Sequence, residues 1–263
     1  MGGDGVAAAV VKVFMATETH ALDVTKEVEG AGQCWSCVAV LPRNAHFCEN
    51  CGKVQPPAST DFFSFFGLPR KLNIDVAALE RAFYRLSRKL HPDVYARASG
   101  QEQEWSLQKS SQLNDAYRTL RDPILRTQYL LGLEGVQLEE QSKAATEQAR
   151  ASGEEKKQVV PPELLEEVFE LNMQLQELRM SKQMGEADPQ TIAELRTAKT
   201  SFERRLNELQ EELKRYWDEW DALTARSATE AERTRVRDKM VDLLNRRSYI
   251  RNLVKDVNEA LEN

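Results

Sequence analysis

The stretch Phe83-Tyr-Arg-Leu-Ser-Arg-Lys-Leu-His-Pro-Asp93 decides the fold of this chain. It ends a helix that is predicted by apolar residues recurring in steps of three and four, at Val76, Leu79, Phe83, Leu86 and Leu90. Pro92 has no backbone N–H and restricts the residue before it, so we expect the helix to stop there. His91 and Asp93 are therefore expected at an exposed helix end beside a rigid turn.

The polar side of the same predicted helix is basic. It carries Arg81, Arg85, Arg88 and Lys89, which gives a positive face leading to a short polar tip. A His-Pro-Asp tripeptide alone is a common turn, so its context decides its meaning. A second helical pattern follows at Leu113-Asn-Asp-Ala-Tyr-Arg-Thr-Leu120, and then come Arg121-Asp-Pro123 and Arg126-Thr-Gln-Tyr-Leu-Leu131.

This whole array, about residues 61–133, resembles a J-domain. The resemblance implies a helical hairpin with the tripeptide in its connecting loop, which docks on a DnaK-type chaperone and triggers ATP hydrolysis. It assigns the triggering contact to His91, Pro92 and Asp93. It implies that the basic face docks on an acidic surface of the ATPase. We expect salt to weaken this association.

The cysteines form a second motif. All four belong to two Cys-x-x-Cys pairs separated by ten residues, at Cys34, Cys37, Cys48 and Cys51. This spacing predicts a metal site in a reducing compartment. Zinc accepts four thiolates in a tetrahedron, so we expect a structural zinc ion, with iron as the alternative for the same ligands. His46 is a competing ligand by position, but we expect it to be a solvent-exposed loop residue.

Composition divides the chain into segments. We expect a disordered arm at residues 1–30, a tetracysteine module at 31–55 and a J-domain at 61–135. A flexible polar linker is expected at 136–160 and a helical bundle at 161–263. Met1 and Met15 are both candidates for the start. The arm has acidic residues and no Arg, unlike a mitochondrial presequence, so we expect a bacterial cytosol, with the mitochondrial matrix as the alternative.

Three long helices are predicted after Pro161. The first carries a seam of Leu164, Val168, Leu171, Leu175 and Leu178. The second begins at Asp188-Pro189, a capping acid and a first-turn proline, and the third at the capping box formed by Thr229 and Glu232. Seven-residue apolar repeats on helices joined by short loops predict an antiparallel three-helix bundle or coiled coil. The expected fold class is therefore all-α.

The first of these helices has more apolar residues than its seam needs. Leu165, Phe169 and Met173 lie off the seam, and Glu166, Glu170 and Glu177 flank them. Tyr249 on the last helix is displaced in a similar way from Ile250. The pattern fits a protein-binding surface as well as it fits a wide core face or a face covered by the J-domain.

The order of these parts resembles the HscB-type co-chaperones of iron–sulfur cluster assembly. The matching motifs are Leu113–Tyr117, Asp122-Pro123, Tyr129–Leu131 and the Cys-Trp-x-Cys pair at Cys34–Cys37. The resemblance covers residues 34–263 apart from the linker. It implies that an IscU-type scaffold binds Leu165, Phe169, Glu170, Glu177 and Tyr249. Met173 joins them by its place in the apolar stripe, although an acid is usual there.

We therefore expect a non-enzymatic co-chaperone that delivers the scaffold to an HscA- or DnaK-type ATPase. One alternative is a zinc-ribbon protein that associates with nucleic acid and has a helical dimerisation tail, but the net charge of −6 argues against nucleic acid. Another is a redox enzyme that uses the cysteine pairs. No apolar run reaches the roughly 18 residues of a membrane span. The oligomeric state stays open, with a homodimer among the states considered.

Overall fold

The computed structural model describes residues 31–42, 44–58, 60–136, 138, 161–185, 188–226 and 228–262. The predicted arm at residues 1–30 lies outside them, as does most of the predicted linker at 136–160. Within this part of the chain the only sheet is a pair of antiparallel strands, β1 (Ala31–Gln33) and β2 (Val40–Pro42), with Gly32 opposite Leu41. The remaining regular structure is helical, which confirms the all-α prediction.

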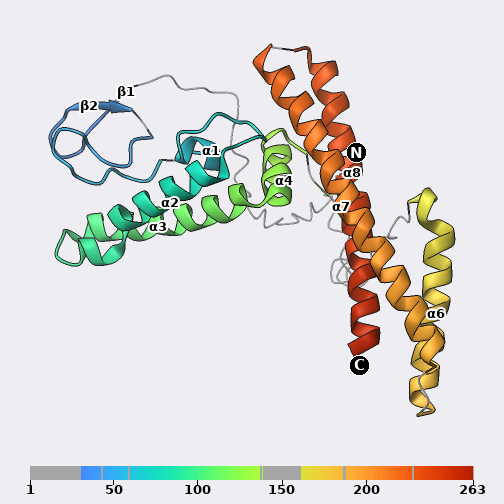
Figure 1. The fold of residues 1–263 in the computed structure, drawn as a ribbon. Helices are drawn as coiled ribbons and strands as arrows, with labels where there is room; N and C mark the ends of the chain where they lie inside the picture. Colours follow the sequence, from blue (N-terminus) through green and yellow to red (C-terminus); the bar gives the residue numbers. More distant parts are fainter. Residues whose placement is uncertain are drawn as a thin grey trace, which may run out of the picture. The chain divides into compact units, whose positions relative to one another are not determined.

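The predicted J-domain is a helical hairpin with flanking short helices (Figure 1). Its elements are α1 (Phe62–Phe65), α2 (Val76–Leu90), the 3₁₀ turn η1 (Pro92–Tyr95), α3 (Gly100–Arg121) and α4 (Pro123–Leu133). Asp75 caps α2 by accepting the N–H of Ala78 at 2.9 Å. The rings of Phe83 and Tyr117 stack across the hairpin with centroids 4.1 Å apart.

The bundle consists of the turn η2 (Pro162–Leu164), α6 (Leu165–Gln183), α7 (Pro189–Ala225) and α8 (Glu230–Glu262). The predicted helix starts are confirmed. Asp188 accepts the N–H groups of Gln190 and Thr191, and Thr229 exchanges capping bonds with Glu232. The side chains of the α6 seam are buried as expected.

The three bundle helices differ in length, and this decides what each part of α7 packs against. At about 1.5 Å per residue, α7 is roughly 55 Å long and α6 only about 28 Å. Helix α6 lies beside the first half of α7, where Glu167 meets Arg205 at 2.7 Å (Figure 1). The second half of α7 is thereby left free to contact the J-domain.

The J-domain joins α7 through one turn of that helix. The carboxylate of Asp221 accepts the backbone N–H groups of Leu72 and Asn73, each at 2.9 Å. Four residues earlier, the indole N–H of Trp217 donates to the hydroxyl of Thr127 on α4 at 2.9 Å. Buried side chains of the J-domain and of the bundle form one continuous hydrophobic cluster around this junction. The two parts therefore share a core.

The tetracysteine module also packs on the J-domain. Val54 is 1% exposed and belongs to a cluster with Phe65, Leu90, Leu113 and Ala116 of the J-domain. The neighbouring Gln55 is 3% exposed. The described module is therefore docked on the hairpin rather than tethered at a distance from it.

Substituting Asp221 by Ala tests the junction between the J-domain and α7. We expect the free energy of unfolding to fall by about 1–3 kcal/mol, because two N–H groups beside the buried Leu72 lose their acceptor. Urea titration followed by circular dichroism measures the change. The matched control is Glu211→Ala, which removes an exposed ion pair with Lys214 and is expected to cost less than about 0.5 kcal/mol. Equal effects of the two substitutions would contradict the described junction.

Candidate functional site

The His-Pro-Asp tripeptide stands where the sequence predicts it, at the end of α2. His91 has left the helical conformation, with φ −60° and ψ 131°, and Pro92 begins η1. The side chain of His91 is 55% exposed and that of Asp93 is 90% exposed. The backbone N–H of Asp93 donates to His91 Nδ1 at 3.2 Å. The imidazole and the carboxylate are thus held close together on the surface.

The end of α2 is fixed by hydroxyl groups of neighbouring elements. The last carbonyls of a helix have no partner within it. Here the carbonyl of Leu90 accepts from the hydroxyls of Ser106 and Ser110 on α3, both at 2.7 Å. The hydroxyl of Tyr95 donates to the carbonyl of Lys89 at 3.2 Å. These bonds hold the tripeptide in place without covering it.

A groove of about 370 Å³ lies between α2 and α3 beside the tripeptide. His91 and Pro92 form part of its wall, and Leu107, which is 62% exposed, contributes an apolar side chain from α3. A partner that contacts the tripeptide can therefore also reach an apolar surface.

The four residues of the predicted basic face are all exposed. Arg81 lies 3.8 Å from Asp75, an ion pair in which both side chains are largely in solvent. The ammonium of Lys89 lies 5.7 Å from the ring centroid of Phe47, which belongs to the cysteine module. The described residues provide no ion-pair partner for Arg85 or Arg88, so their charge is available to a partner protein.

The structure brings all four predicted metal ligands together. The sulfur atoms of Cys34, Cys37, Cys48 and Cys51 lie within 4.8 Å of one another. The closest pairs, Cys34 with Cys51 and Cys37 with Cys48, are 3.6 Å apart, far beyond a disulfide of about 2.05 Å. A tetrahedral zinc site with bonds of about 2.3 Å places its sulfurs about 3.8 Å apart. The geometry fits such an ion, and the cysteines would supply all of its ligands.

The charges of the cluster also call for a cation. Burial raises the pKa of Cys34, but backbone N–H groups of Cys37 and Ser36 outweigh this and lower it to about 6. A hydrogen bond from the backbone of Lys53 lowers the pKa of Cys51, but burial and the neighbouring sulfurs outweigh it and raise this pKa to about 11. Four adjacent thiolates repel one another, so a bound cation is needed to hold them all ionised.

His46 differs from the expectation of a solvent-exposed loop residue. Its Nε2 lies 2.9 Å from the carbonyl of Phe65, and its ring packs on the Phe65 ring with centroids 4.4 Å apart. Desolvation lowers its pKa. His46 is therefore a contact between the module and α1, and it is not part of the ligand group.

A lysine is buried in the same contact region. Lys109 of α3 is 2% exposed, and its ammonium lies 3.5 Å from the carbonyl of Ala45. Burial lowers the pKa of Lys109 to about 8. The docked module therefore helps to cover the Lys109 side chain.

The apolar stripe on α6 is exposed. Leu165, Phe169 and Met173 are 55%, 69% and 58% exposed, so the alternatives of a wide core face and of cover by the described J-domain are wrong. The stripe continues to Met180 and Met184, which are 51% and 75% exposed. Glu166, Glu170 and Glu177 are exposed beside it. Five large apolar side chains in solvent on one helix form an unusual surface for a soluble domain.

Tyr249 does not belong to this exposed surface. Its side chain is 4% exposed, and burial raises its pKa. The neighbouring Ile250 is buried as well. Helix α8 packs against both other bundle helices, since its Lys239 lies 3.5 Å from Glu219 of α7 and Lys182 of α6 donates to the carbonyl of Ala260. A helix that is covered by two others buries a wider face than a single seam. The prediction that Tyr249 lies off the buried face of α8 is therefore wrong.

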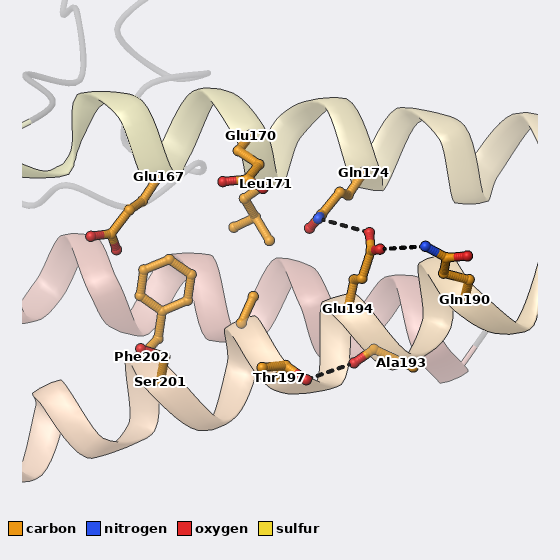
Figure 2. A pocket seen from close by; sticks show the side chains of 11 residues that line it. Glu167, Glu170, Leu171, Gln174, Gln190, Ala193, Glu194, Thr197, Ser201 and Phe202 are labelled. Carbon is orange, nitrogen blue, oxygen red and sulfur yellow. Dashed lines mark hydrogen bonds between the residues drawn. The ribbon is translucent and has the colours of Figure 1, made fainter.

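A second groove, of about 610 Å³, lies between α6 and α7. Figure 2 shows that Glu194 lies across it and accepts hydrogen bonds from the amides of Gln174 and Gln190, at 3.2 and 3.1 Å. Glu167 and Glu170 lie on its α6 wall. On the α7 side the lining is neutral apart from Glu194.

The comparisons with known proteins agree with this geometry. Residues 61–129 match the DnaJ domain family. Over 92 residues the chain is 47% identical to the "Co-chaperone protein HscB homolog" of Bordetella petrii, a match that covers 35% of this chain and 54% of the relative. Residues 61–129 therefore form a J-domain, and the chain is similar to HscB-type co-chaperones.

A plant relative extends the matched region beyond the J-domain. The "Iron-sulfur cluster co-chaperone protein HscB homolog" of Arabidopsis thaliana is 30% identical over 177 residues, which is 66% of this chain and 62% of the relative. The chain spans about half the length of the curated relatives it matches.

The fold has a solved counterpart. The crystal structure of human co-chaperone protein HscB superposes with a TM-score of 0.58 at 21% identity, over 87% of this chain and 98% of that one. The two chains therefore share a fold although most of their residues differ. None of the helices described here is long and apolar enough to cross a membrane.

Sequence reasoning missed three features of these candidate sites. Met180 and Met184 lie seven and eleven residues after Met173, a spacing that could have extended the stripe. Leu107 beside the tripeptide follows no apolar period, so nothing in the sequence marks it. The contact between the module and α3 could not be found either, because its residues are far apart in the chain.

Metal removal tests the cysteine cluster. We expect one zinc ion per chain, and we expect all four thiols to react with a thiol reagent only after a chelator has removed the ion. The count is direct, since the chain has no other cysteine. Metal analysis and thiol titration make the measurement, and Cys37→Ser should lose the ion. Thiols that react at once in the metal-loaded protein would favour the redox alternative instead.

Proposed function

We propose that this chain is a non-enzymatic co-chaperone. Its J-domain would stimulate ATP hydrolysis by an HscA- or DnaK-type chaperone, and its bundle would bind an IscU-type iron–sulfur scaffold. The observation that carries the proposal is the tripeptide at His91–Asp93, exposed and held at the tip of a DnaJ domain. The relatives named as iron–sulfur cluster co-chaperones support the client class.

The basic face supports the direction of docking. Arg85 and Arg88 lie on the exposed side of α2, and their charges point to an acidic surface on the ATPase. Charged groups at the rim of an interface mainly speed association and set orientation. The tripeptide at the end of the same helix would then contact the ATPase in a single orientation.

The exposed stripe on α6 supports a protein client. Phe169 and Met173 would act as apolar anchors, and methionines adapt their shape to a partner. Glu170 and Glu177 would pair with basic groups at the edge of the scaffold. Leu165 extends the anchor surface at the start of the helix. Tyr249 is left out of this contact surface because it is buried.

The cysteine cluster would hold a structural ion. Zinc supplies folding energy to a module that has only a small core of its own, and its closed shell leaves no open position for catalysis. Iron is the alternative. Two further predictions stay open. The compartment is a bacterial cytosol or a mitochondrial matrix, and the oligomeric state is a monomer or a homodimer.

Substituting His91 by Gln tests the J-domain part of the proposal. We expect stimulation of the chaperone's ATPase to fall to the unstimulated rate, while the unfolding temperature stays the same, because His91 is half exposed and ends its helix. Steady-state ATP turnover and thermal unfolding make the two measurements. Glu104→Gln, on the exposed face of α3, is the matched control and should stimulate normally. Normal stimulation by the His91 variant would refute the mechanism.

Substituting Phe169 by Ala tests the bundle part. We expect affinity for the scaffold to fall about tenfold or more, because truncating an aromatic hot-spot anchor at an interface costs about 2 kcal/mol or more and about 1.4 kcal/mol is tenfold. Calorimetric titration with an IscU-type scaffold measures it. Leu125→Ala removes a partly exposed side chain of α4 and should leave the affinity unchanged. Equal affinities of the two variants would place the scaffold elsewhere.

A further inference from the structure

The loop that carries the tripeptide is held at its far end by a capping box. Ser99 caps α3, and its hydroxyl and backbone N–H donate to Glu102 Oε2 at 2.9 and 3.3 Å. The backbone N–H of Glu102 donates in return to the Ser99 hydroxyl. The amide of Gln103 donates to the carbonyl of Ala98 at 3.1 Å. The start of α3 therefore decides where the loop from His91 to Ser99 ends.

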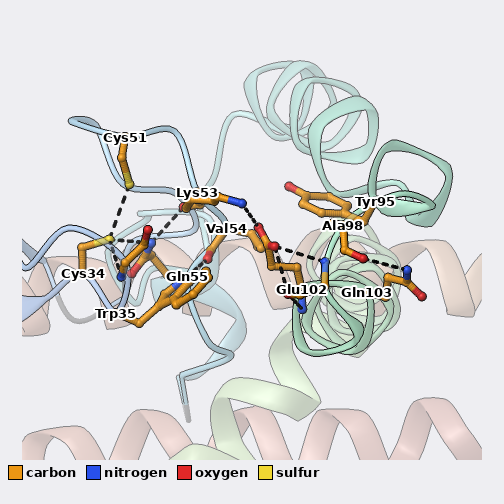
Figure 3. Close-up of polar contacts among 12 residues, drawn as sticks. Cys34, Trp35, Cys51, Lys53, Val54, Gln55, Tyr95, Ala98, Glu102 and Gln103 are labelled. Atoms are coloured by element: carbon orange, nitrogen blue, oxygen red, sulfur yellow. Dashed lines mark hydrogen bonds and ion pairs between the residues drawn. The ribbon is translucent and has the colours of Figure 1, made fainter.

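The second oxygen of the same carboxylate belongs to the cysteine module. Glu102 Oε1 accepts from the ammonium of Lys53 at 2.8 Å, and Glu102 is 4% exposed (Figure 3). Lys53 follows Cys51 by two residues. Its own carbonyl accepts the N–H of Cys48 and the amide of Gln55, at 2.9 and 2.8 Å. The turn around the second cysteine pair thus places this ammonium on the cap of α3.

The first cysteine pair contacts α3 one turn further along. Trp35 follows Cys34, and its ring meets the ring of Trp105 edge-on, with centroids 5.5 Å apart. Its indole N–H donates to the carbonyl of Val54 at 2.8 Å. The ammonium of Lys53 lies 6.0 Å from the centroid of Trp35. The two cysteine pairs therefore each contribute one side chain to the same part of α3, and the four sulfurs fix the distance between them.

We propose that Lys53 and Trp35 are positioning residues for the tripeptide loop. With its ion bound, the module holds the first turns of α3 through Glu102 and Trp105 and so restrains the loop that ends at Ser99. The inference deepens the proposed function, since the loop is the part that would contact the ATPase. The cysteine module would then restrain a loop of its own chain and would not serve to bind another molecule.

Amide hydrogen exchange of the zinc-loaded chain tests the inference. In Lys53→Ala we expect exchange at residues 96–103 to rise about two- to fivefold, the effect of one partly exposed ion pair. We expect ATPase stimulation to fall by a similar factor. Glu102→Gln should act in the same direction, because Gln can still cap Ser99 but loses the charge pairing with Lys53. Removal of zinc by a chelator should raise the exchange of these amides at least as much.

The matched control is Glu104→Gln, two residues along the same helix, where the carboxylate meets only the amide of Gln108 among the described residues. It should change neither the exchange nor the stimulation. His91→Gln separates this inference from the proposed function, since it should lose stimulation while keeping the exchange of residues 96–103 unchanged. Unchanged exchange at these residues in both Lys53→Ala and the zinc-free protein would overturn the inference.

Discussion

The carboxylate of Asp221 joins the J-domain to the helical bundle. It accepts two consecutive N–H groups from the loop that leads into α2, and Trp217 on the same face of α7 binds α4. The helix that carries the basic face and the tripeptide therefore begins at a fixed place on the bundle. Without this contact the chain would be a J-domain and a helical bundle with no common core.

The tripeptide and the apolar stripe lie on different helices of the joined J-domain and bundle. The tripeptide lies at the end of α2, and the apolar stripe of α6 lies beside the half of α7 that does not contact the J-domain. A client on α6 and an ATPase on α2 would then be held by one molecule at the same time. The cysteine module packs on the opposite side of α3 from the groove at the tripeptide, since it contacts Trp105 and Lys109 while Leu107 and Asn114 line the groove.

Local rules were enough to predict the elements. Pro92 ends α2, Asp188 begins α7, and the spacing of the cysteines gathers four sulfurs. Contacts between distant elements were beyond these rules. Tyr249 is buried because α8 is covered by two helices, and Lys53 reaches Glu102 across 49 residues of chain. The exposure of the stripe on α6 could be suspected but not decided, because periodicity shows which side chains share a face and not what covers it.

The proposed function requires one chain to act on both a DnaK-type ATPase and an iron–sulfur scaffold. The steady-state ATP turnover of such a chaperone from the same cell tests this, measured with this chain, with an IscU-type scaffold, and with both. We expect faster turnover with the chain alone and a further rise when the scaffold is added. Turnover that the chain leaves unchanged, with or without the scaffold, would contradict it.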